Sequence, residues 1–405
     1  MNFYYFLSQR INSNSAKSFS GLVNKIAIIS VAISLAAMMI SFAILHGFKH
    51  QIQEKIFSFG GHIKISKYDI KNSLEESPIS NQSPFYEAAK NHPEILHIQT
   101  YSHKAALLKT QEGVSGIMLK GISKDFDTLR FAKNLIQGHL PYINDTSYSR
   151  SFAISQKIAL KMNLHLGDTA IVFFVQQPPR FRKLAVCGIY ETSMEEFDDV
   201  VAFCDQRLNQ VINHWEDTLV GGFEILIKDF SKIDTVSNQM LELLDYDMQL
   251  EKVTDQYLQL FEWLKLLDKN VVIFLSLILL VAGFNIISTL FIMIMESTAM
   301  IGILKALGAT NYQIQKIFVY LGLQIIAKGL FWGNLIGLSL CAVQYFFRII
   351  PLDPSTYYMP FAPIYWDWKI FFLLNLIAFL LIAILLLIPV MIIANIKPVK
   401  AIRWD

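Results

Sequence analysis

Histidines four residues apart could form a metal site in this sequence. His46 and His50 have the spacing of the two ligands on a zinc-protease helix, but Gly47 stands where that motif carries its general-base Glu. Neither a GxxxxGK[ST] phosphate-binding loop nor a G-x-S-x-G nucleophile elbow occurs in the sequence. We therefore predict no metal site and no catalytic activity on this chain.

The three cysteines are Cys187, Cys204 and Cys341, too few and too widely spaced for a disulfide framework. Cys341 lies within an apolar run and is predicted to be a buried thiol. Cys187 and Cys204 could pair if their part of the chain is extracytoplasmic. Because a disulfide requires the two Cα atoms to lie close together, the sequence leaves that pairing open.

Composition indicates the class of protein. The chain has 405 residues, of which 53% are hydrophobic and 17% charged, and the apolar residues are grouped in blocks. This is too apolar for an ordinary soluble protein. The formal net charge of +2 argues against a nucleic-acid-binding protein, which would carry a strongly basic surface. A membrane protein is the prediction.

Four apolar stretches are long enough to cross a bilayer as helices. They are residues 26–47, 270–295, 317–347 and 370–394. The first two flank residues 48–268, where short apolar runs typical of strands alternate with helical patterns. The predicted fold class is therefore a membrane protein with four transmembrane helices and a large α/β domain inserted between helices one and two.

Particular elements are expected in the inserted domain. The predicted strands are Gly60–Ile65, Ala105–Leu108, Ser115–Leu119, Ala170–Val175, Leu184–Val186, Val200–Phe203 and Phe223–Ile227. The predicted helices are Pro84–Lys90, Gln156–Met162, Gln206–Ile212 and Lys232–Leu244.

Lysine and arginine near the membrane predict which segments are cytoplasmic. They are enriched in residues 1–25, 296–316 and 395–405, which we place in the cytoplasm. The inserted domain and the loop 348–369 then lie outside it.

The third span contains a stripe of small residues. Gly329, Gly333 and Gly337 recur every four residues, a pattern that permits close helix packing in lipid. Lys328 lies beside this stripe, and its charge must either extend to the lipid headgroups or face protein.

A polar stretch, Met295–Val319, separates the second and third spans. Gly308 followed by Ala-Thr-Asn predicts a helix end and a new N-cap, hence two short helices with a bend. Ile301, Leu304 and Leu307 recur at helical spacing and should form an apolar face that is exposed to water unless a partner covers it. An ordinary connection between two helices would have a similar composition.

Three segments carry a resemblance to a known family. Glu296 with Ile301–Ala309 resembles the "E…EIGxLKAxGA" signature of ABC-transporter permeases of the FtsX/MacB-like class, with Met300 where many members have a second Glu. Gly138–Pro141 and Ile154–Thr169 resemble part of the MacB-like periplasmic domain. Leu352–Pro360 resembles the "LDPS.YY…P" loop of the lipoprotein-releasing (LolC/LolE) branch.

The resemblance implies a function and a location. The chain would be a permease subunit in the bacterial inner membrane, with a periplasmic domain and an FtsX-like permease domain at 273–399, and would extract lipoproteins for transfer to the outer membrane. A separate ATPase would hold ATP and Mg²⁺, and no cofactor would bind to this chain. Further expected partners are a second permease, identical or homologous, the lipoprotein, membrane lipids and a periplasmic carrier.

The same resemblance implies three groups of site residues. The ATPase would contact the coupling helix at Glu296, Ile301, Gly302, Leu304, Lys305, Leu307 and Gly308. The lipoprotein's acyl chains would lie among Ile40, Phe42, Ile44, Phe48, Val272, Phe274, Leu275 and Ile278. The carrier would bind a hairpin tip containing Pro178, Pro179, Arg180 and Arg182, although a solvated loop would have a similar composition.

Two other functions remain open at this point. One is an FtsX-like regulator of a periplasmic cell-wall hydrolase, and the other is a MacB-like efflux permease. The sequence does not distinguish a homodimer from a heterodimer, nor a LolC-like from a LolE-like role.

Overall fold

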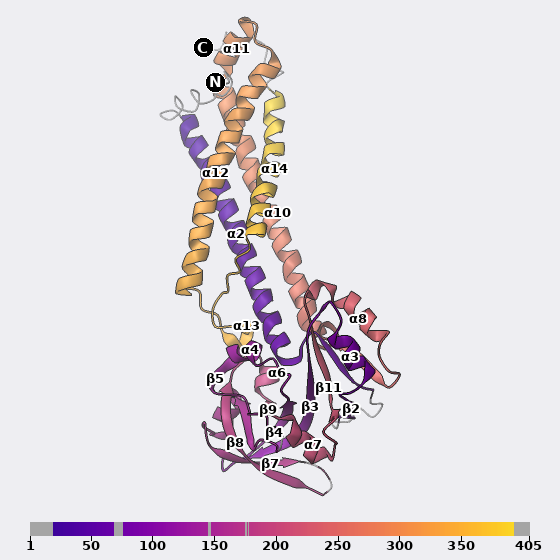
Figure 1. Ribbon diagram of the computed structural model, residues 1–405. Coiled ribbons are helices and arrows are strands. Elements are labelled where there is room, and N and C mark those ends of the chain that lie inside the picture. The colour runs from indigo at the N-terminus through magenta and orange to yellow at the C-terminus, as the bar shows by residue number, and fades with distance from the viewer. Residues whose placement is uncertain (1–18, 69–75, 145–146, 175, 177, 393–405) are drawn as a thin grey trace. The chain divides into compact units, whose positions relative to one another are not determined.

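The computed structural model describes residues 19–68, 76–144, 147–174, 176 and 178–392, which form two compact units. The helical unit includes the described residues up to His50, Trp263–Pro351 and those from Phe361 onward. The inserted unit comprises Gln51–Glu262 together with Leu352–Pro360 (Figure 1). The N-terminal segment up to residue 18 and the tail from residue 393, both predicted to be cytoplasmic, lie outside the described residues.

Four long helices dominate the helical unit (Figure 1). They are α2 (Phe19–Gly60), α10 (Leu258–Glu296), α12 (Asn311–Phe347) and α14 (Trp368–Ile392). Each is long and apolar enough to cross a membrane. The first three contain the predicted spans 26–47, 270–295 and 317–347, and α14 covers the fourth as far as Ile392, the last described residue. Helix α2 continues without a break well beyond residue 47, and its last residues belong to the inserted unit.

The glycine stripe of α12 packs directly against α2. A Cβ atom added to Gly333 would lie 2.9 Å from both the Ala32 backbone oxygen and the Leu35 Cβ, and one added to Gly329 would lie 2.7 Å from the Val31 Cβ. Gly337 similarly faces Ala36 and Met39. Only glycine permits these backbone approaches, so the predicted close packing is confirmed.

Polar side chains connect other helix pairs of this unit. Asn334 on α12 and Asn375 on α14 exchange two hydrogen bonds of 2.7 and 2.9 Å. Asn285 on α10 donates to the Ser30 hydroxyl on α2 at 2.6 Å. Such bonds stabilise helix association where the surroundings offer no water. Lys328, in contrast, is exposed on the surface of the helical unit, away from its core.

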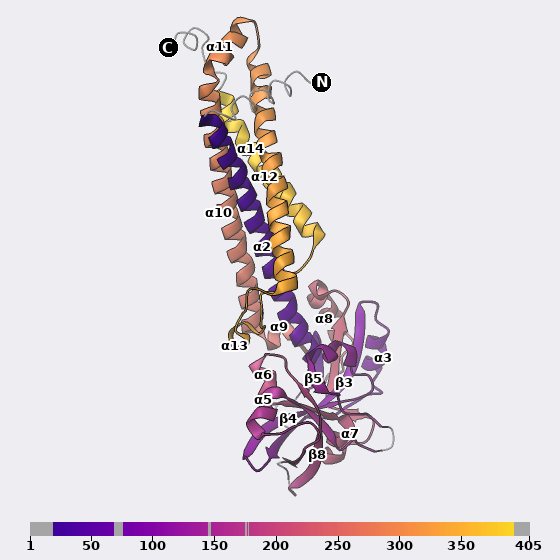
Figure 2. The same ribbon diagram turned by 90° about the vertical axis from the view of Figure 1, so that its left-hand side faces the viewer.

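The inserted unit is built on a ten-stranded mixed sheet (Figure 2). Its strands are β1 (Ile63–Lys67), β3 (Ile95–Lys109), β4 (Val114–Ile122), β5 (Leu135–Gly138), β6 (Ser151–Ser155), β7 (Thr169–Phe174), β8 (Arg180–Tyr190), β9 (Val201–Asp205), β11 (Gly222–Ile227) and β12 (Met248–Lys252). The short strands β2 (Ile79–Ser80) and β10 (Leu219–Val220) pair separately.

Part of this sheet closes on itself. The order is β12-β1-β11-β3-β4-β9-β6-β8-β5, and β7 pairs with both β8 and β3. The strands from β3 round to β7 therefore form a small barrel. Its interior is filled by alternate side chains of those strands, including Leu108, Leu119, Phe152, Val172 and Val186, each at most 1% exposed.

Short helices complete the inserted unit. They are α3 (Pro84–Lys90), α4 (Thr128–Phe131), α5 (Gln156–Met162), α6 (Glu195–Asp198), α7 (Gln206–Asn213), α8 (Ile233–Leu241), α9 (Val253–Gln256) and α13 (Pro354–Tyr357). Predicted helices α3 and α5 have the predicted bounds, and α7 ends one residue later. The helix expected at 232–244 is shorter, because α8 ends at Leu241.

The seven predicted strands all exist, but most are longer than predicted. The first, β1, instead begins three residues later than predicted, at Ile63. β3 extends from Ile95, ten residues before the predicted start, and β8 begins at Arg180 rather than Leu184. Cys187 on β8 and Cys204 on β9 are free thiols, so the pairing left open by the sequence does not occur. Cys341 is buried in the helical core, as predicted.

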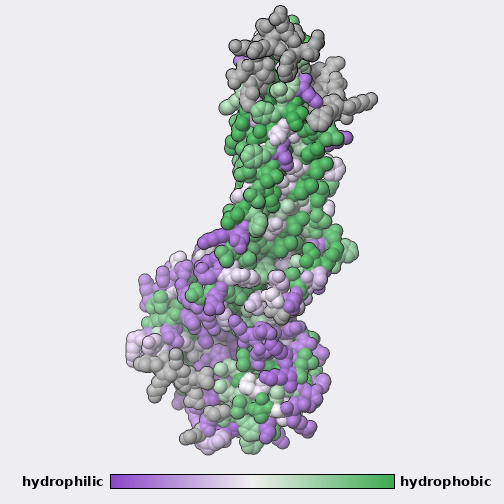
Figure 3. Space-filling view, turned by 180° about the vertical axis from the view of Figure 1, so that it is seen from behind, coloured by the Kyte–Doolittle hydropathy of each residue, from purple (hydrophilic) through white to green (hydrophobic). Residues whose placement is uncertain are grey.

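Surface hydropathy differs between the two units. Apolar side chains cover the face of the helical unit seen in Figure 3, whereas hydrophilic side chains cover most of the visible inserted unit. On α14 alone, Phe372, Leu376, Ile384 and Met391 are each at least 42% exposed. Surfaces of this kind are stable in lipid and not in water.

The contact between α12 and α2 predicts the effect of enlarging Gly333. Gly333→Leu places a branched side chain where a Cβ already meets backbone, so we expect thermal unfolding in detergent to show a loss of about 1–3 kcal/mol. Leucine also has the higher helix propensity, which opposes this loss. Ala327→Leu, on the exposed face of the same helix, is the matched control and should not lower stability. Equal stabilities for the two variants would contradict the proposed packing.

Candidate functional site

The stretch between the second and third spans folds as a helix, a tight turn and a second helix. Helix α11 (Thr298–Ala306) ends before Gly308, which has a φ of +92° and ends the helix in the left-handed conformation. Thr310 then caps α12 through a reciprocal capping box with Gln313. The bend and its N-cap are as predicted. The prediction of two short helices is wrong, because the second helix continues to Phe347 as the third span.

The exposed face of α11 is not the predicted one. Ile301 is 0% exposed and Gly302 is buried, and Leu304 packs partly against the helical core. The outward apolar side chains are Ile303, 55% exposed, and Leu307, 80% exposed. The periodicity identified the helix correctly, but its predicted apolar face turns toward the chain's own core, and Leu307 alone of the predicted three is exposed.

We call the outward side chains of this stretch the coupling face. It is defined by Met295, Ala299, Ile303, Ala306 and Leu307, all exposed. Ala299, Ile303, Ala306 and Leu307 follow one another at helical spacing along α11 and its end, and therefore lie along one side, while Met295 lies in the last turn of α10. Of the remaining predicted contact residues, Glu296 and Gly308 are exposed and Lys305 is half-buried.

The residues predicted to contact acyl chains do not form one surface. On α2, Phe48 is buried, Ile44 is half-buried, and Ile40 and Phe42 pack against the helical core. On α10, Leu275 is a core residue and Ile278 is half-buried.

Only Val272 and Phe274 of that predicted group are exposed, at 57% and 63%. They belong to an outward apolar face of α10 that sequence reasoning had only partly identified. Its members are Val272, Ile273, Phe274, Leu277, Leu280, Val281 and Phe284.

The predicted hairpin tip is a true hairpin but a shorter one. β7 and β8 pair antiparallel as far as Phe174 and Arg180, so Arg180 and Arg182 lie on a strand rather than in a loop. Pro178 and Pro179 are in the tip. The Arg180 guanidinium donates to the backbone oxygens of Val211 and Ile212 at 3.3 Å. That side chain therefore stabilises the fold of the inserted unit.

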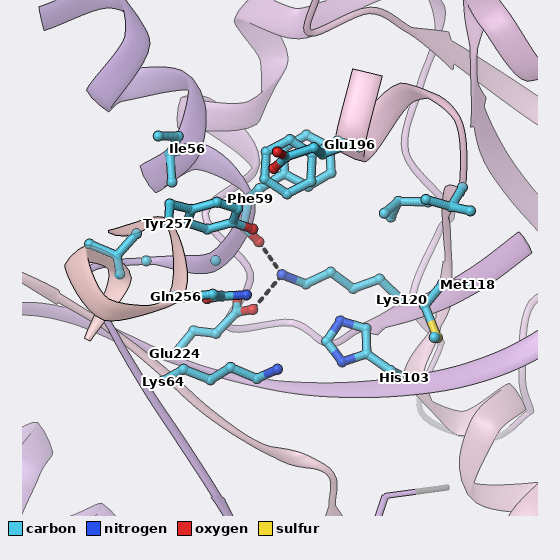
Figure 4. Close-up of a pocket in the computed structure, with 16 residues that line it drawn as sticks. Ile56, Phe59, Lys64, His103, Met118, Lys120, Glu196, Glu224, Gln256 and Tyr257 are labelled. Carbon is cyan, nitrogen blue, oxygen red and sulfur yellow. Dashed lines mark hydrogen bonds and ion pairs between the residues drawn. The ribbon is translucent and has the colours of Figure 1, made fainter. Parts of the chain in front are cut away.

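A polar site that sequence reasoning missed lies at the end of α2 (Figure 4). The Lys120 ammonium on β4 donates to the Phe59 backbone oxygen in the last turn of α2 and forms an ion pair with Glu224 on β11. Both charged residues are only 2% exposed. Burial lowers the pKa of Lys120, while the carboxylate of Glu224 opposes that shift.

A cavity of about 270 Å³ adjoins this ion pair. It is also lined by Lys64, His103, Gln256 and Tyr257, and in the view of Figure 4 the Gln256 side chain lies beside Glu224. The available sequence signal was a charged residue in each of two apolar strands, Lys120 after Met118-Leu119 and Glu224 between Phe223 and Ile225. A charge at such a position is almost always paired when buried.

No group of three or more His, Cys, Asp and Glu side chains is placed to hold a metal ion among the described residues. The rings of His46 and His50 instead contact Phe42 and Tyr365.

Comparison with known proteins identifies relatives along the whole chain. Residues 272–398 match the family model for the FtsX-like permease C-terminal domain. The "Lipoprotein-releasing system transmembrane protein LolC" of Xylella fastidiosa (strain Temecula1) is 21% identical over 412 residues, which cover 98% of this chain and 97% of that protein. LolE of Haemophilus influenzae is 21% identical, with 91% of each chain covered.

Two solved structures are also similar. The periplasmic region of MacB from Actinobacillus actinomycetemcomitans is 14% identical, has a TM-score of 0.36 and covers 50% of this chain and 92% of its own. The extracellular domain of the transporter YknZ from Gram-positive bacteria is 15% identical, has a TM-score of 0.34 and covers 47% of this chain and 100% of its own.

The family prediction is confirmed by the sequence relatives. An FtsX-like permease domain together with LolC and LolE relatives supports the LolC/LolE branch of this class. The architecture of four apolar helices with an α/β domain between the first two is likewise as predicted.

His62 follows the end of α2 and makes this region sensitive to acid. Burial, with a smaller effect from Arg130, lowers the pKa of His62 to about 3, and its Nδ1 accepts a hydrogen bond from the Ile227 amide at 3.0 Å. The unfolded chain takes up the proton near pH 6.5, whereas the folded chain does not. The free energy of unfolding that depends on a neutral His62 is therefore fully present above pH 6.5 and is lost as the pH falls toward 3.

We expect acidification from pH 7.5 to pH 5 to lower the stability of the full chain by about 1–2 kcal/mol through His62. His62→Gln, which keeps an acceptor for the Ile227 amide, should remove that part of the pH dependence in thermal unfolding. His165→Gln, at an exposed histidine, is the control and should leave it unchanged. If the stability of His62→Gln depends on pH as that of the wild type does, His62 is not the source of this acid sensitivity.

Proposed function

We propose, from the premise that this is a permease of the FtsX-like class in its LolC/LolE branch, that the chain extracts lipoproteins from the inner membrane. The observation that carries the proposal is the similarity to LolC over 98% of this chain and 97% of the relative. Both the membrane helices and the inserted domain thus have counterparts in a protein named for lipoprotein release. In this proposal the inserted domain lies in the periplasm of a bacterial cell.

A separate ATPase supplies the energy in this proposal. It binds ATP and Mg²⁺, while this chain takes no direct part in hydrolysis and carries no cofactor. The ATPase seats on the coupling face, where Ile303 and Leu307 are exposed although apolar. A covering partner would remove that apolar surface from water, which favours docking at this position.

The lipoprotein's acyl chains contact the outward face of α10, which includes Val272 and Phe274. That face is apolar apart from Ser276, whose hydroxyl donates to the Val272 backbone oxygen at 2.8 Å, and it belongs to a helix that begins at Leu258. A second permease, identical or homologous, would complete the lipid-facing site. Lipid tails and acyl chains are chemically alike, so shape and motion rather than polarity must select the substrate.

The hairpin of β7 and β8 is our proposed contact for a periplasmic carrier. Its exposed side chains at the strand end are Phe181 and Lys183, and the tip holds Pro178 and Pro179. Arg182 lies between them and is half-buried. Because Arg180 is held by backbone oxygens, the carrier would contact these residues in its place.

The direct test is ATP-driven release in a reconstituted system. The chain, its partner permease, the ATPase and a triacylated lipoprotein are placed in lipid nanodiscs with a soluble acceptor, and release into the soluble fraction is measured. We expect release only with hydrolysable ATP. ATP hydrolysis without any release, or activation of a cell-wall hydrolase in its place, would overturn the proposal in favour of a regulatory function.

The coupling face yields a separate prediction. Leu307→Glu puts a charge where the ATPase should bury an apolar side chain, an interaction worth about 1.5–3 kcal/mol. We expect the amount of copurified ATPase to fall at least about tenfold, with insertion into the membrane unchanged.

Leu129→Glu is the matched control for this prediction, since Leu129 is 85% exposed on the inserted unit. It should leave ATPase binding at the wild-type level. A Leu307→Glu, Ile303→Glu double variant that still copurifies with stoichiometric ATPase would exclude the coupling face as the docking site.

A further inference from the structure

The last turn of α2 is held by a side chain from the sheet. The final carbonyls of a helix have no partner within the helix. Here the Lys120 ammonium, on β4, donates to one of them, the Phe59 oxygen. A cation at a helix C-terminus also interacts favourably with the helix dipole. Lys120 therefore acts as a C-terminal cap that is supplied by a strand 61 residues further along the chain.

Glu224 fixes the position of this cap. Its Oε1 is the ion-pair partner of Lys120, and its Oε2 accepts a hydrogen bond of 2.8 Å from the Gln99 side chain on β3. Gln99 in turn accepts from the Asp127 amide at 3.0 Å. Because β11, β3 and β4 are neighbours in the sheet, the network connects three adjacent strands to the end of α2.

The surroundings of this network are mostly apolar. Phe59 is 3% exposed and stacks on Phe197 with 4.2 Å between ring centroids. Ile56 and Phe57 are also buried. Removing an ion pair from water is costly, and a well-packed apolar pair of similar size is often at least as stabilising. An apolar pair, however, cannot donate a hydrogen bond to a backbone oxygen. It therefore cannot fix the position of the helix end relative to the sheet.

The segment that leads into α10 lines the same cavity. Val253, Gln256 and Tyr257 border the cavity of about 270 Å³ together with the ion pair and Phe59. The Val253 amide donates to the His62 oxygen at 3.0 Å, so this segment is also held close to the end of α2. The bond from Lys120 to Phe59 is a side-chain contact by which the sheet holds the last turn of α2.

We propose that Lys120 and Glu224 form a clamp that fixes the last turn of α2 to strands β4 and β11, so that displacement of α2 moves the sheet of the inserted unit. Lys120 and Glu224 are positioning residues, since they act by holding the end of α2 and contact no substrate in this proposal. The use of this clamp in transport rests on the proposed function, whereas the mechanical link itself does not.

The link is tested on the full chain alone in lipid nanodiscs. Lys120→Met with Glu224→Met replaces the ion pair by apolar side chains of similar length and should preserve folding. We expect amide exchange at residues 56–60 to accelerate at least about tenfold, with β4 and β11 as protected as in the wild type. Wild-type exchange at residues 56–60 would overturn the clamp.

Two further variants keep the test decisive. Lys157→Met with Glu195→Met removes an exposed ion pair of 3.0 Å from the same unit and should leave exchange at residues 56–60 unchanged. Glu224→Gln keeps an oxygen acceptor for Lys120 but removes its countercharge, and should accelerate exchange there by a smaller factor. If the double Met variant does not fold, the Glu224→Gln variant decides the test. Amide exchange at residues 56–60 that equals the wild-type rate in this variant overturns the clamp.

A transport measurement separates the clamp from the proposed function. In nanodiscs with the ATPase and a lipoprotein, the double Met variant should hydrolyse ATP at near the wild-type rate but release about tenfold less lipoprotein. Wild-type release despite a freed last turn would exclude a role in transport. If the wild-type chain itself releases no lipoprotein, the proposed function fails, and the exchange result alone decides the mechanical link.

Discussion

The close contact between α12 and α2 is the interaction on which the helical unit depends. Lipid tails are as apolar as leucine side chains, so burial of apolar surface does not drive these helices together, and close backbone packing must do so. Gly329, Gly333 and Gly337 permit that approach. The two Asn residues that connect α12 to α14 then add hydrogen bonds that lipid cannot replace. With α12 seated on α2, the start of α12 also positions the turn at Gly308 and the coupling face before it.

Much of this architecture could be predicted from the sequence, because length and hydropathy alone identify helices that cross a membrane. The end of α2 could also be predicted. Its helical pattern continues from the apolar window into polar residues, and Gly60-Gly61 ahead of an alternating strand pattern indicates where it ends. β3, in contrast, was largely missed. Gln99, Thr100 and Ser102 are polar but buried, and their partners include Glu224 and Asn209, more than 100 residues away.

The candidate site shows the same division between local and tertiary information. The coupling stretch was recognisable from its residues and from the helix-ending Gly308. Its outward face was not, because α11 has two apolar sides and only packing decides that Ile301 faces the core while Ile303 faces outward. The pairing of Lys120 with Glu224 was likewise hidden, because the two residues lie 104 positions apart. The sequence could indicate only that each is a charge within an apolar strand.

The central claim is that this chain handles lipoproteins at the outward face of α10. The most direct measurement replaces Phe274, 63% exposed, with a photoreactive amino acid in the full chain in its native membrane. The account predicts a light-dependent crosslink to an acylated lipoprotein that disappears when the ATPase is active, and no such crosslink from the same residue at the buried position Leu275. Crosslinks to phospholipid alone at Phe274, with or without ATP, would contradict it.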